Sequence, residues 1–513
     1  GRNSGGIGYE ANTSLRTFVG TQTADYNFNL GNNHNFNVLG GFEAQETVSE
    51  SSSASGTQFP NQSLRTLNSA SAEFAISGSK SEYTFVSAFS RANYNYDGKY
   101  FLSASLRRDG SSRFGADNRW GTFYSFGGSW VASNEAFLED VSFLNLLKVR
   151  SSWGVTGNAA IGDFPSQGLY VYGQDYDGNP GGSPSQIANP DLTWESQQNF
   201  NVGVDFGLFS KISGTVEYFE RTSSDLILNV PITLTSGFSS LTQNFGEMKN
   251  TGFEISMNAD IISNDDFNWN VGFNTTFLKN EITELTDDFT DGAYRRQEGE
   301  DFQSFYLYSW AGVNQENGDP QWYTDASKTT ITNDISEAER FLDDKSATPE
   351  FFGGFNTMVS YKDFSLSANF IYSYGNYIFD SRARGTLGDG RLTPRSTADF
   401  IYDNRWQPGS TDALVPQFVW GGRNGSNEAN QTRWLYDGSY IRLRDLTVAY
   451  NFNEDITSLL GLNSMRLYAR GTNILTFVKE DILYIDPEQG IDGSYTGQTP
   501  AVKTISIGLD IQL

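Results

Sequence analysis

The sequence has no cysteine, a single histidine (His34) and few cations. Without cysteine the chain forms neither a disulfide framework nor a thiolate metal site. A lone histidine in a predicted turn argues against a serine or cysteine nucleophile that needs a histidine base. Lysine and arginine number 35 against 61 acidic residues, which gives a net charge of -26. This acidity argues against a nucleic-acid surface, which needs clustered lysine and arginine.

Long hydrophobic runs are missing as well. No stretch approaches the roughly 18 apolar residues that a membrane-spanning helix needs. The chain is instead rich in aromatic residues, with 39 Phe and 26 Tyr, and has only 4 Met, a balance that favours strands over helices. In a strand that alternates apolar and polar residues, a running average of hydropathy stays low. A β-barrel is therefore the one way left for this chain to cross a bilayer.

The last stretch, residues 502–513, alternates apolar and polar residues with the period of a strand. Its apolar positions are Ile505, Ile507, Leu509, Ile511 and Leu513. A regular strand with an open edge invites aggregation, so we expect both of its edges to be paired, as in a closed barrel. The same two-faced pattern recurs at 100–107, 212–218 and 465–470.

About seventeen stretches show strand patterns. They are residues 13–30, 35–50, 82–95, 100–109, 119–132, 144–156, 193–206, 212–226, 246–262, 267–283, 301–313, 320–326, 350–361, 363–379, 434–452, 464–477 and 502–513. The connections alternate between short ones, such as 31–34, and long ones, such as 51–81. This asymmetry is typical of outer-membrane barrels, which have tight periplasmic turns and long outer loops. The predicted fold is therefore all-β, a transmembrane antiparallel up-and-down β-barrel.

An odd number of strands does not close a bacterial single-chain barrel, because these barrels have even strand numbers. The first predicted strand begins at the outer rim, so an odd number of strands must precede it. We therefore expect residues 1–513 to form the C-terminal part of a larger barrel.

Several segments carry a family resemblance. They are SYIRLRDLTVAY at 439–450, RLYARGTNILT at 466–476 followed by DPE at 486–488, LKVRSSWG at 147–154, NTGFEI at 250–255 and ATPEF at 347–351. In combination they make the chain resemble SusC/RagA-type TonB-dependent outer-membrane transporters. The features that carry this resemblance extend from about residue 95 to the end of the chain. One departure is Leu513, which stands where the family usually ends on Phe.

The resemblance implies a 22-stranded barrel filled by an N-terminal plug, as large barrels of this kind are. The plug and about five strands would then lie outside this chain. It further implies a multi-pass protein of the bacterial outer membrane that imports bulky nutrients, either oligosaccharides or peptides. A SusD-like surface lipoprotein would close the mouth, and a TonB complex would act on the plug. No bond is made or broken, so no enzymatic activity is expected. Whether transporter and lipoprotein pairs dimerise is left open.

Aromatic and charged side chains of two long loops, 157–192 and 380–433, are the candidate substrate contacts. They are Tyr170, Tyr172, Asp175, Tyr176, Arg382, Arg384, Trp406, Trp420 and Arg423. Aromatic faces suit sugars, and charges suit peptide termini. The alternative is that these residues fold their own loops or pack on the lid.

Metal and cofactor signals are weak. Residues 175–178 begin like a calcium loop, but the twelfth position is Gln186 instead of glutamate, so the motif fails. No cofactor is predicted, and only a structural loop calcium is left open by the acidity. Arg107, Arg466 and Arg470 lie on polar faces, where we expect contacts with the barrel wall or the plug. The alternative is that they line a substrate path.

Two other functions are compatible with a barrel. An adhesion or secretion-associated barrel would use its long loops to bind proteins, and a large assembly without lid or ligand would favour it. A barrel-embedded hydrolase would need a catalytic pair that the sequence does not offer. Loss of turnover on substitution of His34 would favour that hypothesis.

Overall fold

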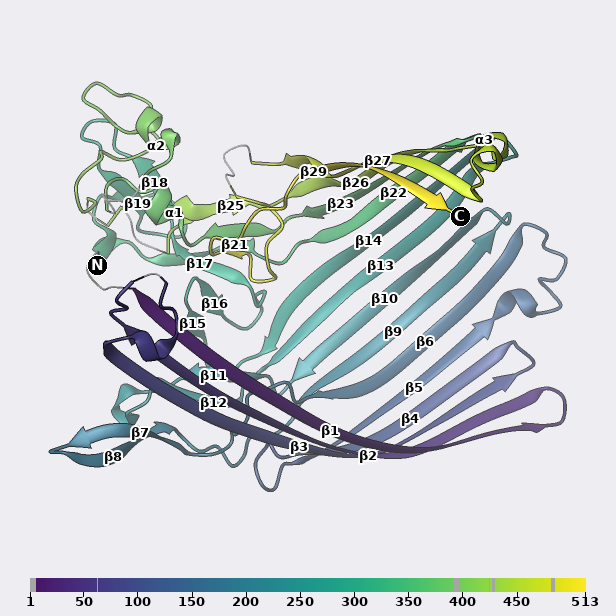
Figure 1. The fold of residues 1–513 in the computed structure, drawn as a ribbon, viewed down its shortest axis with the longest axis horizontal. Helices are drawn as coiled ribbons and strands as arrows, with labels where there is room; N and C mark the ends of the chain where they lie inside the picture. The colour runs from purple at the N-terminus through teal and green to yellow at the C-terminus, as the bar shows by residue number, and fades with distance from the viewer. Residues whose placement is uncertain (1–5, 62, 392–395, 424, 427–429, 481–484) are drawn as a thin grey trace. The chain divides into compact units, whose positions relative to one another are not determined.

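The computed structural model describes residues 6–61, 63–391, 396–423, 425–426, 430–480 and 485–513. Its main feature is a sheet of fifteen strands in chain order (Figure 1). The strands are β1 (Ile7–Leu30), β2 (His34–Thr57), β3 (Ala72–Tyr96), β4 (Tyr100–Ser111), β5 (Trp120–Val131), β6 (Leu144–Asn158), β9 (Glu195–Leu208), β10 (Ile212–Ser224), β13 (Glu247–Ser263), β14 (Phe267–Glu284), β22 (Phe351–Tyr361), β23 (Phe364–Tyr374), β26 (Tyr440–Asn451), β27 (Ser464–Val478) and β29 (Thr504–Gln512). Neighbours such as β1 and β2 or β13 and β14 are antiparallel. The all-β, up-and-down architecture is confirmed.

The strand count is a correction, because two of the seventeen predicted strands lie in small separate sheets. Residues 301–313 and 320–326 contribute to these sheets and not to the large one. One contains β15 (Phe289–Asp291), β16 (Tyr294–Arg296), β17 (Ser304–Tyr308) and β21 (Arg340–Ser346), and the other contains β18 (Trp310–Val313), β19 (Pro320–Tyr323) and β20 (Ile331–Thr332). Phe305, Leu307 and Trp322 are fully buried in this region. The apolar residues therefore build a local core.

The predicted Ser-rich loop at 51–81 is also corrected. β2 continues to Thr57 and β3 begins at Ala72, so most of the predicted loop is strand. Ser51 and Ser79 face each other in register, with their hydroxyl oxygens 2.7 Å apart. At the end of β2, serine on both faces leaves no alternation of polarity, which is why the pattern did not reveal this strand end.

The other long connections carry short elements of their own. Hairpins form from β7 (Leu169–Tyr176) with β8 (Asn179–Gln186) and from β11 (Ile227–Pro231) with β12 (Ser240–Asn244). β24 (Tyr377–Asp380) lies between β25 (Leu435–Asp437) and β28 (Ser494–Tyr495). The helices are α1 (Ala383–Thr386), α2 (Asp399–Asn404) and α3 (Glu454–Leu459), and the 3-10 turns are η1 (Leu67–Ser69), η2 (Ala132–Asn134), η3 (Leu234–Ser236), η4 (Ile335–Glu337) and η5 (Thr432–Trp434). None of the helices found in the described ranges is long and apolar enough to cross a membrane.

The hairpin predicted at 96–99 is confirmed. Asp97 and Gly98 both have positive φ angles, 55° and 66°, as a two-residue turn of this type requires. Glycine adopts that angle without steric cost, and aspartate is among the residues that tolerate it. The turn fixes the register in which Tyr96 faces Tyr100.

Strands of the large sheet have one apolar and one polar face. In β14, Phe273 lies opposite Phe355 of β22, whose ring stacks on Phe370 of β23 with centroids 4.4 Å apart. Phe273 is exposed. Asn270 and Asn274 alternate with it and lie on the opposite face. The sheet therefore presents bare aromatic surface on one side and amides on the other.

The chain divides into two compact units. The first comprises Gly1–Trp130, Ser151–Phe200 and Ser223–Gly246, and the second comprises Val131–Arg150, Asn201–Thr222 and Glu247–Leu513. In the first unit a small core forms from Phe114, Leu192 and Trp194. In the second unit a larger core joins the small sheets and helices, and its buried residues include Phe379 and Ile401.

Candidate functional site

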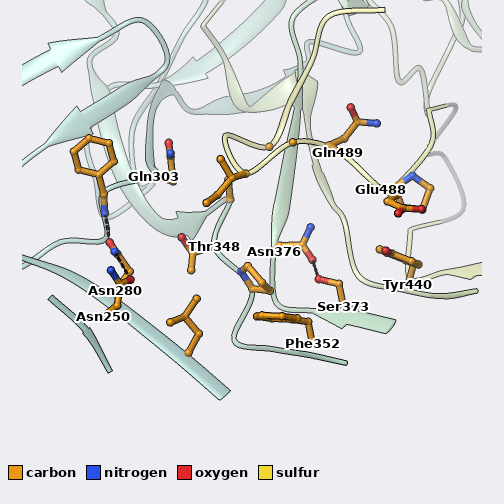
Figure 2. A pocket seen from close by; sticks show the side chains of 18 of the residues that line it. Asn250, Asn280, Gln303, Thr348, Phe352, Ser373, Asn376, Tyr440, Glu488 and Gln489 are labelled. Carbon is orange, nitrogen blue, oxygen red and sulfur yellow. Dashed lines mark hydrogen bonds between the residues drawn. The ribbon is translucent and has the colours of Figure 1, made fainter. Parts of the chain in front are cut away.

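A cavity of about 410 Å³ lies within the second unit. It opens on the polar face at one end of β13, β14, β22, β23 and β26, and segments around 302–303, 347–349 and 487–493 close over it. Figure 2 shows polar side chains converging on it from these strands and segments. Its size and its mixed lining are those of a small-ligand site.

Asn250 and Asn280 form one end of the cavity. They face each other in the register of β13 and β14, and the Asn280 amide nitrogen donates to the Asn250 Oδ1 at 2.8 Å. The backbone N–H of Phe302 donates to the Asn280 Oδ1 at 2.7 Å. These bonds orient both amides and tie the incoming segment at 302 to the sheet.

The other end is formed by Ser373, Asn376 and Tyr440. Ser373 of β23 and Tyr440 of β26 are paired in register on the polar face. The Ser373 hydroxyl donates to the Asn376 Oδ1 at 2.8 Å. Gly438 leaves room for this amide, because a Cβ there would lie 2.6 Å from the Asn376 Nδ2. Between the two ends lies the ring of Phe352, opposite Ser373 (Figure 2).

Asp301 organises the rim of the cavity. Its Oδ1 accepts hydrogen bonds from the Gln303 backbone N–H at 2.7 Å, the Ser346 hydroxyl at 2.6 Å and the Thr348 hydroxyl at 3.0 Å. The backbone carbonyl of Gln303 also accepts from Ala347 N–H at 3.3 Å. Gln303 is thereby held with its Oε1 buried and without a hydrogen-bond partner within the described ranges.

An ion network fixes the segment that covers the cavity. Arg442 of β26 donates to Asp486 Oδ1 and to Glu488 Oε2, both at 2.6 Å. Arg444 donates to the same Glu488 oxygen at 2.8 Å. The Arg442 side chain is only 3% exposed. Glu488 lines the cavity, but its charge is balanced by the two guanidinium groups.

Burial acts to raise the pKa of the Asp486 carboxyl. The hydrogen bonds that it accepts from Arg442 and from the backbone N–H groups of Glu488 and Ala501 outweigh burial and hold the pKa below its usual range. Asp486 is therefore ionised at neutral pH and remains paired with Arg442.

Four of the nine sequence-predicted contacts lie in the first unit, on β7. Tyr170 and Tyr172 are well exposed, with Tyr172 at 79%. The Asp175 Oδ1 accepts from Gly178 N–H at 2.9 Å and thereby stabilises the hairpin turn. The side chain of Tyr176 lies outside the described residues. The two exposed tyrosines have rings available for a ligand.

The other five lie in the second unit. Trp420 is 82% exposed, Arg382 is exposed and Arg384 is half-buried. Trp406 is buried against Val313 and Ala413. These five residues therefore differ in how much of each side chain a ligand could reach.

Trp406 and Arg423 have partners in their own loops. The Trp406 indole donates to the Gln315 carbonyl at 2.8 Å. The Arg423 guanidinium pairs with Asp319 at 2.5 Å and donates to Gln417 Oε1 at 2.6 Å. Both residues hold the loop structure together.

Sequence reasoning missed the residues that line the cavity. Asn250 lies inside the NTGFEI segment that carries part of the resemblance, but 30 residues separate it from Asn280. Neither strand pattern revealed that the segments at 302, 348 and 488 fold onto the same polar face. The only signal was the placement of amides near strand ends.

The three strand arginines behave as predicted for barrel-wall contacts. Arg107 pairs with Asp109 at 2.6 Å, Arg470 with Asp445 at 2.5 Å and Arg466 with Asp510 at 3.7 Å. Across the described residues, no group of three or more acidic or histidine side chains could hold a metal ion. His34 Nδ1 lies 2.8 Å from the Tyr94 hydroxyl.

Comparison with known proteins decides the family. The family model for the TonB dependent receptor-like β-barrel matches residues 1–474. The chain belongs to this family. TonB-dependent receptor P3 of Formosa agariphila is 33% identical over 99% of this chain and 54% of that protein. TonB-dependent receptor SusC of Bacteroides thetaiotaomicron is 30% identical over 84% of this chain and 44% of that protein.

A solved structure agrees with this membership. The structure of the RagAB peptide transporter matches with a TM-score of 0.85 and 29% identity, over 98% of this chain and 56% of the other. The SusC/RagA resemblance and the barrel fold are thereby confirmed. This TonB-dependent receptor chain spans about half the length of the curated relatives it matches.

Proposed function

We propose that this chain forms the C-terminal part of the barrel of an outer-membrane importer for bulky nutrients, either oligosaccharides or peptides. The observation that carries the proposal is the match in fold over nearly the whole chain to the RagAB peptide transporter, together with the relative named SusC. Import is a property of the whole protein, of which this chain corresponds to about half.

The two faces of the large sheet support a membrane location. The stacked rings of Phe355 and Phe370 and the exposed ring of Phe273 suit hydrocarbon, and the amides of Asn270 and Asn274 suit a water-filled or plugged lumen. A soluble protein seldom leaves such a contiguous aromatic surface bare. The bacterial outer membrane is the location that fits.

The remainder of the protein would supply an N-terminal plug and further strands, in agreement with the share of the relatives that this chain covers. A TonB complex would act through the plug, and a SusD-like lipoprotein would close the mouth. Exposed Tyr170, Tyr172, Arg382 and Trp420 are then available to the cargo or the lid. The cavity near Asn250 would be a further contact point inside the mouth.

The proposal is tested on the full-length protein purified from its native membrane. Intact mass measurement should give a chain about twice as long, and a surface lipoprotein should copurify. Cells that lack the protein should lose uptake of fluorescent oligosaccharides or peptides and regain it with the wild-type gene. Unchanged uptake of every cargo tried, with no lipoprotein bound, would contradict the proposal.

A further inference from the structure

The cavity in the second unit has a lining with no uncompensated charge. We infer that it takes an uncharged, hydroxyl-bearing unit of the cargo, one saccharide ring in size, and rejects carboxylated or sulfated units. The inference rests on the proposed import function and adds a selectivity site to it.

Three polar groups at the cavity have unused hydrogen-bonding capacity. Gln303 Oε1 is a buried acceptor without a partner in the described part of the chain. Asn250 and Asn376 use their Oδ1 atoms as acceptors, and neither amide nitrogen donates to another described group. Buried polar groups normally find partners, and Gln303 Oε1 is the buried one of the three. Asn250 and Asn376 are half-buried, and their amide nitrogens can donate to the same ligand. A hydroxyl both donates and accepts, and several hydroxyls around one ring can satisfy all three.

Phe352 supplies the apolar part of the site. Phe352 is 39% exposed, and its side chain projects from β22 between the two polar ends (Figure 2). Leu278 and Ile491 add further apolar lining. A saccharide ring has an apolar C–H face and polar edges, and therefore matches an aromatic surface with amides on either side.

The charges around the cavity argue against an anionic unit. The described lining contains no lysine or arginine. The nearest guanidinium groups, of Arg442 and Arg444, are engaged by Asp486 and Glu488. A carboxylate or sulfate would lose its hydration without gaining a cation, and it could not donate to Gln303 Oε1.

The test uses the full-length transporter with its lipoprotein. Neutral glucans and mannans, the same chains bearing uronate or sulfate groups, and short peptides are compared by isothermal titration and by uptake in cells. The variant Asn250→Asp still accepts the bond from Asn280, but it loses its donor and adds a negative charge. Asn258→Asp is the matched control, because Asn258 is an exposed amide on the same face of β13.

We expect at least one neutral saccharide to bind and its anionic counterpart to bind at least tenfold more weakly. Asn250→Asp should weaken the neutral saccharide about tenfold, which corresponds to about 1.4 kcal/mol, and Asn258→Asp should not. Equal binding of the anionic counterpart, no effect of Asn250→Asp, or binding of peptides alone would overturn the inference. Uptake of peptides alone would leave the import proposal intact, whereas failure of all uptake would overturn both.

Discussion

The Arg442 Nη2 of β26 lies 2.6 Å from the Asp486 Oδ1, in the segment between β27 and β29. The second Nη of the same guanidinium reaches Glu488. One buried side chain thus holds the segment that closes the cavity. This arrangement makes the covering segment sensitive to substitution and to pH.

Removal of the Arg442 guanidinium should release the covering segment. Arg442→Met leaves Asp486 and Glu488 close to each other without their shared cation, and loss of one partner of a buried pair costs about 3–5 kcal/mol. Amides of residues 485–501 should then exchange hydrogen much faster in mass-spectrometric measurements, while the sheet remains protected.

Arg466→Met is the control for this change. Its partner Asp510 lies at 3.7 Å, and both side chains are largely exposed, at 44% and 59%. Exposed pairs contribute about 0–1 kcal/mol, so exchange in 485–501 should not change. Equal exchange in the two variants would show that Arg442 does not hold the segment.

The same segment should loosen in acid. The pKa of Asp486 lies below its unfolded value of about 3.9, so its contribution to stability is present above about pH 4 and is lost as the pH falls through the folded pKa. Limited proteolysis at residues 485–501 should increase over this range. In Arg442→Met the increase should begin at higher pH. The same pH onset of cleavage in wild type and in Arg442→Met would contradict the assignment.

The contribution of Asp380 to stability should depend on pH in the opposite direction from that of Asp486. Burial raises the pKa of this carboxyl, and hydrogen bonds from Arg382 and Ala383 N–H offset burial only in part. Its ionised form is disfavoured, so stability falls as the pH rises from the unfolded pKa through the folded pKa. Asp380→Asn keeps an acceptor and removes the charge. It should protect β24 better than wild type at neutral pH, an advantage that disappears in acid, and poorer protection at neutral pH would be inconsistent with a raised pKa.

Gly252 should tolerate no side chain. A Cβ there would lie 2.0 Å from the Phe277 carbonyl oxygen and 2.7 Å from the Phe219 ring. Gly252→Val should lower the free energy of unfolding by about 1–3 kcal/mol or more, because the strand or the buried ring must move. Urea unfolding in detergent measures this.

Gly40 of β2 provides the comparison for Gly252, since β2 is paired on both sides and a Cβ added at Gly40 would have no heavy atom within 4 Å. Gly40→Val should be neutral or slightly stabilising, because valine favours strands. Similar losses of unfolding free energy at the two positions would show that the close approach at Gly252 does not determine the cost.

The sequence carried enough information to predict the two-faced strands. In β14 and β29 the period of two is regular, and at Asp97-Gly98 the turn chemistry is specific. The sequence did not show that Trp322 belongs to a small separate sheet and not to the barrel. Aromatic residues occur in barrel strands and in buried strands alike, so the local pattern is the same. Nor did the sequence reveal the end of β2, where both faces are polar.

The cavity could not be predicted from one sequence. Asn250, Gln303 and Asn376 meet only because connections fold back onto the polar face, and those contacts depend on Asp301 and Arg442. Local patterns carry no information on such distant pairings. For the same reason the sequence did not distinguish buried Trp406 from exposed Trp420, since both lie in one loop of similar composition.

Spin labels placed singly at residues 268–274 of β14, in the full-length protein in bilayers, give the most direct test of a lipid-facing sheet. We predict alternation: labels at Trp269, Val271 and Phe273 should be accessible to oxygen dissolved in lipid, and those at Asn268, Asn270 and Asn274 should not. Uniform accessibility to a water-soluble nickel reagent at all positions would contradict a lipid-facing apolar surface, and the importer proposal with it.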